Sequence, residues 1–254
     1  MAIEFTVGTN TLLELTSSSH GTVRVPLAQN FDYTPSFDER RIFEFDSSDA
    51  VAIVTNFNGV DIAFTHFDSN NQLVDAMVND LDPGAIALVD DPSRFKDITI
   101  TLNIRRKKDD KIFQSVLAKG VRITGAAASE PVREEGIVAR TGVATNVFRL
   151  KGVALEYNRV VRSGSSAFAQ GSSNSHADKT TTTSGSDEEF DVDNTPQVVE
   201  ADDPAINGKS IIHVLKNGDE FTGTISIVGT TVSIPTTEFA TDDVFEVWTA
   251  YIDV

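Results

Sequence analysis

Gly208-Lys209-Ser210 matches the end of the phosphate-binding P-loop, in which backbone amides hold nucleotide phosphates and the lysine contacts them. The complete motif needs a glycine five residues before Gly208, but Asp203 occupies that position and Pro204 follows it. An aspartate there would repel phosphate. We therefore interpret the three residues as a turn that opens a strand.

The sequence contains no recognised catalytic or metal-binding motif built on histidine, serine or cysteine. The four histidines are widely spaced and match no zinc-binding pattern: His20, His66, His176 and His213. His66-Phe67-Asp68 could hold a metal or act as a base, although a surface histidine at a strand end is the simpler interpretation. The Gly-x-Ser-x-Gly elbow of serine hydrolases is absent, and there is no cysteine. We expect a protein with no catalytic residues, no cofactor and no bound metal.

Two charged runs could bind ligands. Residues 187–194 read DEEFDVDN and alternate oxygen-bearing side chains, as calcium prefers, but they lack the glycine and final glutamate of an EF-hand loop. A weak surface calcium site and a solvated acidic run both remain open. Residues 105–110 read RRKKDD, without the interleaved aromatics of nucleic-acid-binding segments. We predict a charged hairpin turn there, with salt bridges to a neighbouring subunit as the functional alternative.

Short β-strands are expected to position these residues. Five runs rich in β-branched and aromatic residues are bounded by turn-forming residues: Ile3–Val7, Thr22–Leu27, Ile42–Phe45, Val51–Thr55 and Asp61–Phe67. Asn58-Gly59 predicts a hairpin turn, because both residues tolerate positive φ. Asp97–Arg105 reads DITITLNIR, and this alternation predicts a half-buried strand. Further strands are expected at Lys111–Lys119, Val121–Thr124, Ile137–Thr141 and Ala144–Tyr157.

One amphipathic helix is expected among the strands. Apolar residues recur at helical spacing in the segment that follows Ser69 and Asn70, either of which can cap a helix: Leu73, Val74, Met77, Val78 and Leu81. Asp82-Pro83-Gly84 ends it. A single helix beside many strands predicts a sheet or barrel with one face covered by the helix.

Composition divides the 254 residues into two units. The net charge is −17, of which residues 1–162 contribute −4 and residues 163–254 contribute −13, so the second unit would repel nucleic acid and anionic membranes. Residues 163–194 are rich in Ser, Thr, Gly and Asp and poor in large apolar residues. We predict a flexible linker there, between a domain at 1–162 and a domain at 195–254. An ordered arm lying on a neighbouring subunit is the open alternative.

The C-terminal domain, residues 195–254, is predicted to be a small Ig-like β-sandwich. Its expected strands are Ser210–Lys216, Gly223–Val228, Thr231–Ile234 and Val244–Ile252, separated by tight turns. Because it is short for an Ig fold, it either borrows strands from the linker side or is a reduced sandwich. The chain has no apolar run long enough to span a bilayer and no secretory signal, so no membrane partner is expected.

The segment Asn30–Val78 resembles the N-terminal part of tail tube proteins of tailed phages, also called major tail proteins. An extended stretch and a charged turn precede the run FEFDSSDAV and a hairpin, and a strand ending in DSNN comes before a short helix. Val121–Glu135 and Phe148–Tyr157 follow in the expected order. The C-terminal run NGDEFTGTISIVGTTVSI is similar to small β-domains that phage tail and fibre proteins append.

This resemblance implies a mainly β fold, a tail-tube β-sandwich or barrel with one flanking helix, plus the C-terminal Ig-like module on the tube exterior. Six copies would form a ring, and stacked rings would form the tube that conducts genomic DNA without binding its sequence. Tape measure and tail terminator proteins would be further partners. The protein would be assembled in the host cytoplasm and located in the virion tail.

Loops at Tyr33–Arg41 and Arg105–Lys111 would then form ring-to-ring contacts. The candidate inter-subunit residues are the charged ones in and beside these loops: Arg40, Arg41, Arg105, Arg106, Lys107, Lys108, Asp109 and Asp110. Two other functions stay open at this point. One is a phage or bacterial surface adhesin that uses residues 195–254 for recognition, and the other is an enzyme with an unrecognised site.

Overall fold

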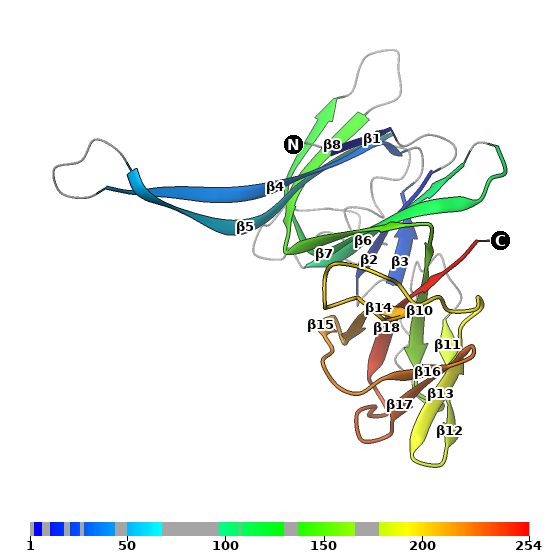
Figure 1. Cartoon of the computed structure of the whole chain (residues 1–254). Coiled ribbons are helices and arrows are strands. Elements are labelled where there is room, and N and C mark those ends of the chain that lie inside the picture. Colours follow the sequence, from blue (N-terminus) through cyan, green and yellow to red (C-terminus); the bar gives the residue numbers. More distant parts are fainter. Residues whose placement is uncertain are drawn as a thin grey trace.

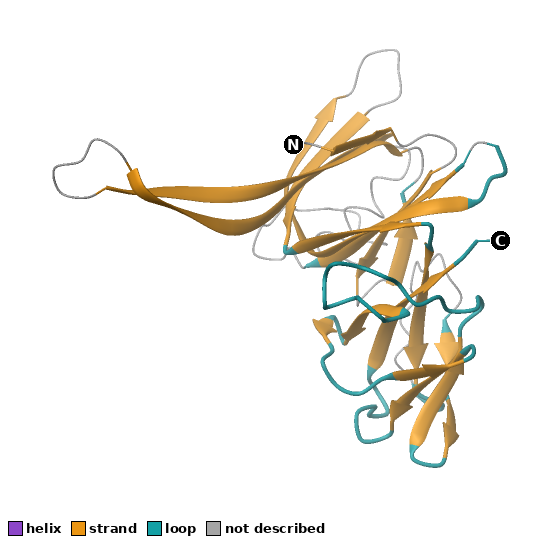
Figure 2. Ribbon diagram, viewed as in Figure 1, coloured by secondary structure: helices purple, strands orange, loops and turns teal. Residues whose placement is uncertain are grey.

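Every element that the computed structural model describes is a β-strand (Figures 1 and 2). The described residues are 3–6, 11–17, 21–25, 28–43, 50–67, 97–106, 108–129, 137–165 and 178–253. Among them, no helix is long and apolar enough to cross a membrane. The helix expected at Ser69–Leu81 lies outside these residues, so the fold described is all-β, without the flanking helix.

The first unit is a nine-stranded antiparallel sheet with the order β1-β4-β5-β8-β7-β6-β2-β3 and with β9 paired to β7. Its strands are β1 (Ile3–Thr6), β2 (Thr11–Ser17), β3 (Gly21–Arg24), β4 (Ala28–Phe43), β5 (Ala50–Phe67), β6 (Ile98–Arg105), β7 (Ile112–Ser129), β8 (Ile137–Ala144) and β9 (Asn146–Lys151). Residues 112–121 of β7 pair with β6 and residues 122–129 pair with β8. Strand β7 therefore joins two halves of the sheet, one formed by β1, β4, β5 and β8 and the other by β6, β2 and β3. The halves share one apolar core, which includes Phe31, Phe64 and Ile100.

The second unit is a β-sandwich of two smaller sheets, with the orders β11-β10-β18-β14-β15 and β12-β13-β17-β16. Its strands are β10 (Ala154–Val161), β11 (Lys179–Thr180), β12 (Thr182–Ser184), β13 (Asp187–Asp191), β14 (Ile211–Lys216), β15 (Asp219–Glu220), β16 (Ser226–Val228), β17 (Thr231–Pro235) and β18 (Val244–Tyr251). Side chains from both sheets form its core, among them Val160, Phe190, Val232, Phe239 and Phe245.

The structure places the boundary between the units earlier than composition suggested. β10, expected in the first domain, pairs along its whole length with β18. The linker prediction at 163–194 is wrong for residues 178–194, which include β11, β12 and β13. The physical reason is that this segment, although it has few large apolar side chains, buries them in the core of the second unit. Phe190 and Val192 are buried in the sandwich core, and the buried carboxylate of Glu188 pairs with Arg162 at 2.8 Å.

Strand β6 shows how the units meet. Its apolar positions face the first core, as the alternation predicted: Ile98, Ile100 and Leu102. Thr101 and Asn103, on the opposite face, are also buried. The Trp248 indole donates a hydrogen bond to the Thr101 hydroxyl at 3.1 Å, and the Asn103 amide donates to the Leu155 carbonyl at 3.1 Å. The predicted half-buried strand is therefore buried on both faces, because the second unit covers its polar side.

A second apolar cluster joins the two units into one body. Leu117 and Phe148 from the first sheet share it with Tyr157, Val199 and Trp248 from the second unit. Figure 1 shows β10 and β18 lying directly below the β2–β3 end of the first sheet. The second unit is therefore packed on the first rather than tethered to it.

Candidate assembly surfaces

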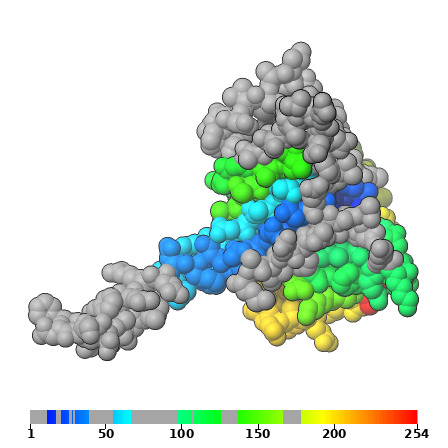
Figure 3. Space-filling model, turned by 90° about the horizontal axis from the view of Figure 1, so that it is seen from above, coloured from blue at the N-terminus to red at the C-terminus, as the bar shows by residue number. Residues whose placement is uncertain are grey.

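The β4–β5 hairpin projects from the body as a long arm (Figures 1 and 3). Near its base, β4 pairs with β1 at residues 30–33, and β5 pairs with β8 at residues 60–67. Beyond Thr34 and Val60, the two strands pair only with each other among the described residues. The loop expected at Tyr33–Arg41 is therefore part of strand β4 in this arm. The strand is long because β5 continues to pair with it beyond the body.

Gly59 lies where the arm leaves the body. Asn58-Gly59 was expected to form a hairpin turn, but both residues lie inside β5, opposite a register shift at Ser36/Phe37. The φ of Gly59 is +115°, and a Cβ atom there would lie 2.8 Å from the Ala144 carbonyl oxygen. The bulge in this strand uses a positive φ at Gly59, and a type I′ turn also needs positive φ, which explains why this sequence pattern suggested a turn.

Two aromatic side chains face solvent on the arm. Phe37 and Phe57 are paired across β4 and β5, with ring centroids 5.6 Å apart, and they are 55% and 51% exposed. Arg40 and Arg41 lie further out on β4, opposite Val54 and Ile53. The arginines were predicted as contact residues from the sequence, and the phenylalanines were not. The sequence does contain an indication that these two phenylalanines are exposed, because each is a single aromatic residue between polar neighbours, in Ser36-Phe37-Asp38 and Asn56-Phe57-Asn58.

The other predicted contact residues form the turn between β6 and β7. Arg105 pairs with Asp110 at 3.0 Å, and Arg106 approaches Asp109 at 3.7 Å. Asp110 has a φ of 56° and its amide donates to the Arg106 carbonyl, which closes the turn. Lys108 is exposed, and Lys107 lies outside the described residues. The arginines and aspartates thus neutralise one another within the chain, and exposed pairs of this kind contribute about 0–1 kcal/mol each. Their contact with another subunit stays a prediction.

A buried carboxyl group lies between the two units. Glu246 is fully buried, and the Tyr157 hydroxyl donates to one of its oxygens at 3.0 Å. Arg159 lies directly opposite Glu246 in the pairing of β10 with β18. Burial raises the pKa of Glu246 to about 7, and the Tyr157 hydrogen bond and the charge of Arg159 limit that rise. The junction therefore contains a carboxyl group that titrates near neutrality.

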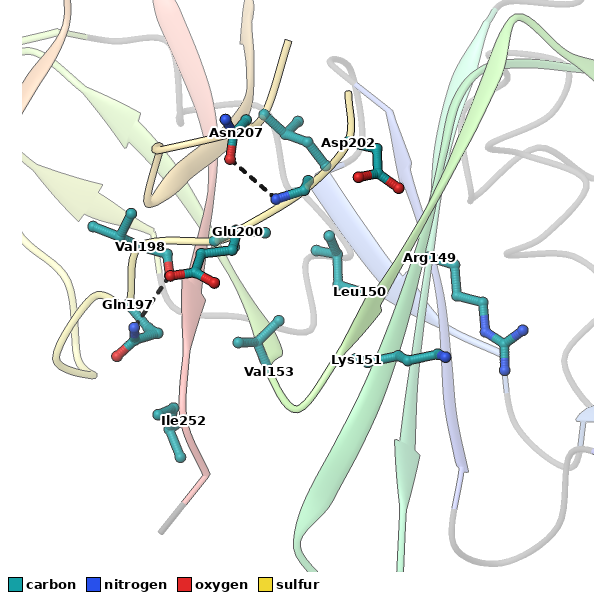
Figure 4. Close-up of a pocket in the computed structure, with 13 residues that line it drawn as sticks. Arg149, Leu150, Lys151, Val153, Gln197, Val198, Glu200, Asp202, Asn207 and Ile252 are labelled. Atoms are coloured by element: carbon teal, nitrogen blue, oxygen red, sulfur yellow. Dashed lines mark hydrogen bonds between the residues drawn. The ribbon is translucent and has the colours of Figure 1, made fainter. Parts of the chain in front are cut away.

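An open groove of about 800 Å³ runs along this junction (Figure 4). Leu150 and Val153, from the end of β9 and the turn into β10, face the extended segment 197–202 of the second unit. Val198 and Ile252 border the groove and are 53% and 49% exposed. We call this feature the junction groove. Because its walls come from both units, sequence reasoning that treated the units separately could not find it.

The basic and acidic side chains of the junction groove lie on opposite sides. Arg149 and Lys151 lie at the β9 margin, and Glu200 and Asp202 lie on the segment across from them (Figure 4). All four side chains are exposed. The groove thus combines an apolar floor with charged margins of both signs.

The remaining sequence candidates have structural roles. His66 is buried, not on the surface, and accepts a hydrogen bond from Arg140 Nε at 3.2 Å while stacking on Phe64. Gly208 has a φ of 72° in the turn before β14. Within the acidic run, Glu188 points inward to Thr181 and Arg162, so its carboxylate does not lie with its neighbours. In the described part of the chain, no three His, Asp or Glu side chains are grouped to hold a metal.

No protein-family profile and no curated protein matches this sequence. Three solved structures share a partial likeness with this chain. A chain of the sheath–tube complex of an extracellular contractile injection system, PVC, in its extended state has 9% identity and a TM-score of 0.39, over 57% of this chain and 91% of its own. The tube-terminating cap of the anti-feeding prophage has 12% identity and a TM-score of 0.35, over 59% and 95%. An Hcp protein has 9% identity and a TM-score of 0.33, over 56% and 91%. Because all three TM-scores are below 0.5, these structures do not support a function for this chain, and function has to be inferred from its own surfaces.

Proposed function

We propose that this chain is a non-enzymatic structural subunit that assembles with copies of itself into a tube. The observation that supports this most directly is the β4–β5 arm, which leaves the body and exposes two adjacent aromatic rings. A free-standing hairpin with exposed apolar side chains is unfavourable in water unless a partner covers it. The order of sequence segments that resembles phage tail tube proteins points to another copy as that partner.

The architecture suits assembly by strand edges as well as by the arm. The first sheet ends at β1 and β3, and each has one edge without a partner strand among the described residues. Neighbouring subunits could continue the sheet through these edges into a closed ring, which would remove the edges from solvent. An arm that contacts a different surface on the next copy gives a head-to-tail contact, and such contacts produce an open filament when the rotation between copies does not close into a ring.

In its finer form the proposal is a tail-tube subunit of a phage or phage-like particle. Rings, six-membered by the resemblance, would stack into a conduit for DNA, with tape measure and tail terminator proteins as further partners. The second unit would lie outside the tube. Its strongly acidic composition would keep that exterior well solvated.

Electron microscopy of the purified full-length chain tests the proposal. We expect hollow rods with a regular axial repeat in negative stain, in a concentration-dependent manner. The double variant Phe37→Ser/Phe57→Ser should stay monomeric and folded, as judged by sedimentation and circular dichroism. A wild-type chain that remains monomeric at high protein concentration would overturn the proposal.

A further inference from the structure

Most exposed large apolar side chains of the described residues fall into two groups. The exposed ones are Phe37, Phe57, Phe113, Val143, Val198, Val228 and Ile252. Phe37 and Phe57 form the ridge on the arm. Val198 and Ile252 border the junction groove, and Phe113 is next to it, since the Gly152 amide beside the groove donates to the Phe113 carbonyl at 2.7 Å. The chain thus has one convex and one concave apolar surface, and both are uncovered.

These two surfaces do not meet within one copy. In Figure 1 the arm extends to the left of the first sheet, whereas the second unit lies below that sheet. The junction groove lies between the sheets, at the turn from β9 into β10. A contact between ridge and groove therefore needs two copies.

Charged side chains border the two surfaces but do not form the contact. Asp38 follows Phe37 and is exposed, and strand alternation places it on the opposite face of the arm from the ridge. The groove has Lys151 at one margin and Glu200 on the opposite wall. The apolar side chains of ridge and groove are therefore what a second copy would cover, with the charged margins left around them.

We propose that the Phe37–Phe57 ridge of one copy binds in the junction groove of a second copy. This inference rests on the proposed function and names the surface that receives the arm. Ridge and groove are different surfaces, so the contact is head-to-tail and can repeat from copy to copy along an assembly, unlike a contact that pairs two copies through the same surface. It also makes the second unit part of the assembly interface, because the groove needs Val198 and Ile252.

The absence of cysteine from the chain allows a direct test by engineered disulfides. One protein has Asn58→Cys, beside the ridge, and another has Gln197→Cys, at the groove. Mixed under mild oxidation and distinguished by a size tag on one of them, they should form a mixed covalent dimer. The double variant should form a ladder of covalent oligomers. The matched control pair, Asn58→Cys with Ser184→Cys in β12 on the far sheet, should not.

The outcomes separate this inference from the proposed function. Rods without a mixed dimer would overturn the ridge-in-groove contact and leave tube formation standing. A mixed dimer without rods would support the contact and overturn the tube. With neither rods nor mixed dimer, both would be wrong.

A second measurement does not depend on disulfide geometry. Val198→Asp should raise the protein concentration needed for assembly at least tenfold, because a charge would be buried in the apolar groove. Val228→Asp is the matched control, since Val228 is 80% exposed and lies in β16, outside both groups. Equal effects of the two substitutions, with unchanged fluorescence of Trp248 as evidence of folding, would contradict the inference.

Discussion

Replacing Glu246 by glutamine isolates the charge that the fold buries at the junction. The carboxyl group is inaccessible to solvent and accepts one hydrogen bond from Tyr157, and its second oxygen has no hydrogen-bond partner among the described residues. Burial dominates over the favourable Tyr157 and Arg159 interactions and raises the pKa of Glu246 from 4.5 to about 7. Glutamine keeps the shape and the acceptor for Tyr157 but cannot ionise.

The sign and size of the effect follow from proton linkage. The folded-state pKa lies above the unfolded one, so the stabilising contribution is complete below pH 4.5 and is lost as the pH rises to about 7. That difference corresponds to roughly 3 kcal/mol in the free energy of unfolding. His213 changes the pH dependence of stability in the opposite direction, because burial lowers its pKa from 6.5 to about 3. The folded protein therefore loses stability through His213 as the pH falls below 6.5. Both proteins contain His213, so its contribution cancels in their difference.

Urea unfolding followed by the fluorescence of Trp248, the only tryptophan, measures this difference directly. Its ring lies 5.0 Å from His213 and 5.1 Å from Tyr157, so it reports on the junction itself. Glu246→Gln and wild type should have similar stability at pH 4.5, and the variant should be more stable by up to about 3 kcal/mol at pH 8. A stability difference that does not change with pH would refute the assignment of this buried charge.

Three further changes test other parts of the fold. Gly59→Ala should lower the free energy of unfolding by about 1–3 kcal/mol, measured by urea titration, because the added methyl meets the Ala144 carbonyl and φ is positive. Arg162→Met should cost about 1–3 kcal/mol in the same assay, since it leaves the buried Glu188 carboxylate without its cation. A chain ending at Arg162 should aggregate in size-exclusion chromatography, because β10 loses β18 and the polar face of β6 loses its cover. A soluble, folded fragment would show that the first unit is independent after all.

The sequence showed where strands lie better than it showed what they pair with. The alternation in DITITLNIR placed Ile98 and Ile100 in the core, as the structure confirms. It could not show that Thr101 is buried too, because a threonine with a hydrogen-bonded hydroxyl is as acceptable inside as outside. Whether the polar face of a strand meets water or another sheet depends on partners far along the chain, here Trp248.

The segment around β13 was misread as a linker for a related reason. Average composition counts apolar residues but not where they point, and strand alternation needs only Phe190 and Val192 to fill one face. The acidic side chains suggested solvation, yet Glu188 is buried because Arg162 and two threonine hydroxyls satisfy it. The charged turn between β6 and β7 lies where the sequence predicted it. The junction groove could not be predicted, because its walls come from two units that are far apart in the sequence.

The close packing of the two units gives the junction groove its significance. Leu155, Tyr157 and Trp248 fix the second unit against the first sheet, and the hydrogen bond from Trp248 to Thr101 fixes its register. A groove with walls on two tethered domains would change shape continually, and binding would then have to offset the entropy of ordering the tether. With the units packed as one body, the groove keeps its shape before a partner arrives. The distance from groove to arm is then also fixed in every copy, and repeated head-to-tail contacts can only produce a regular spacing along an assembly if that distance is constant.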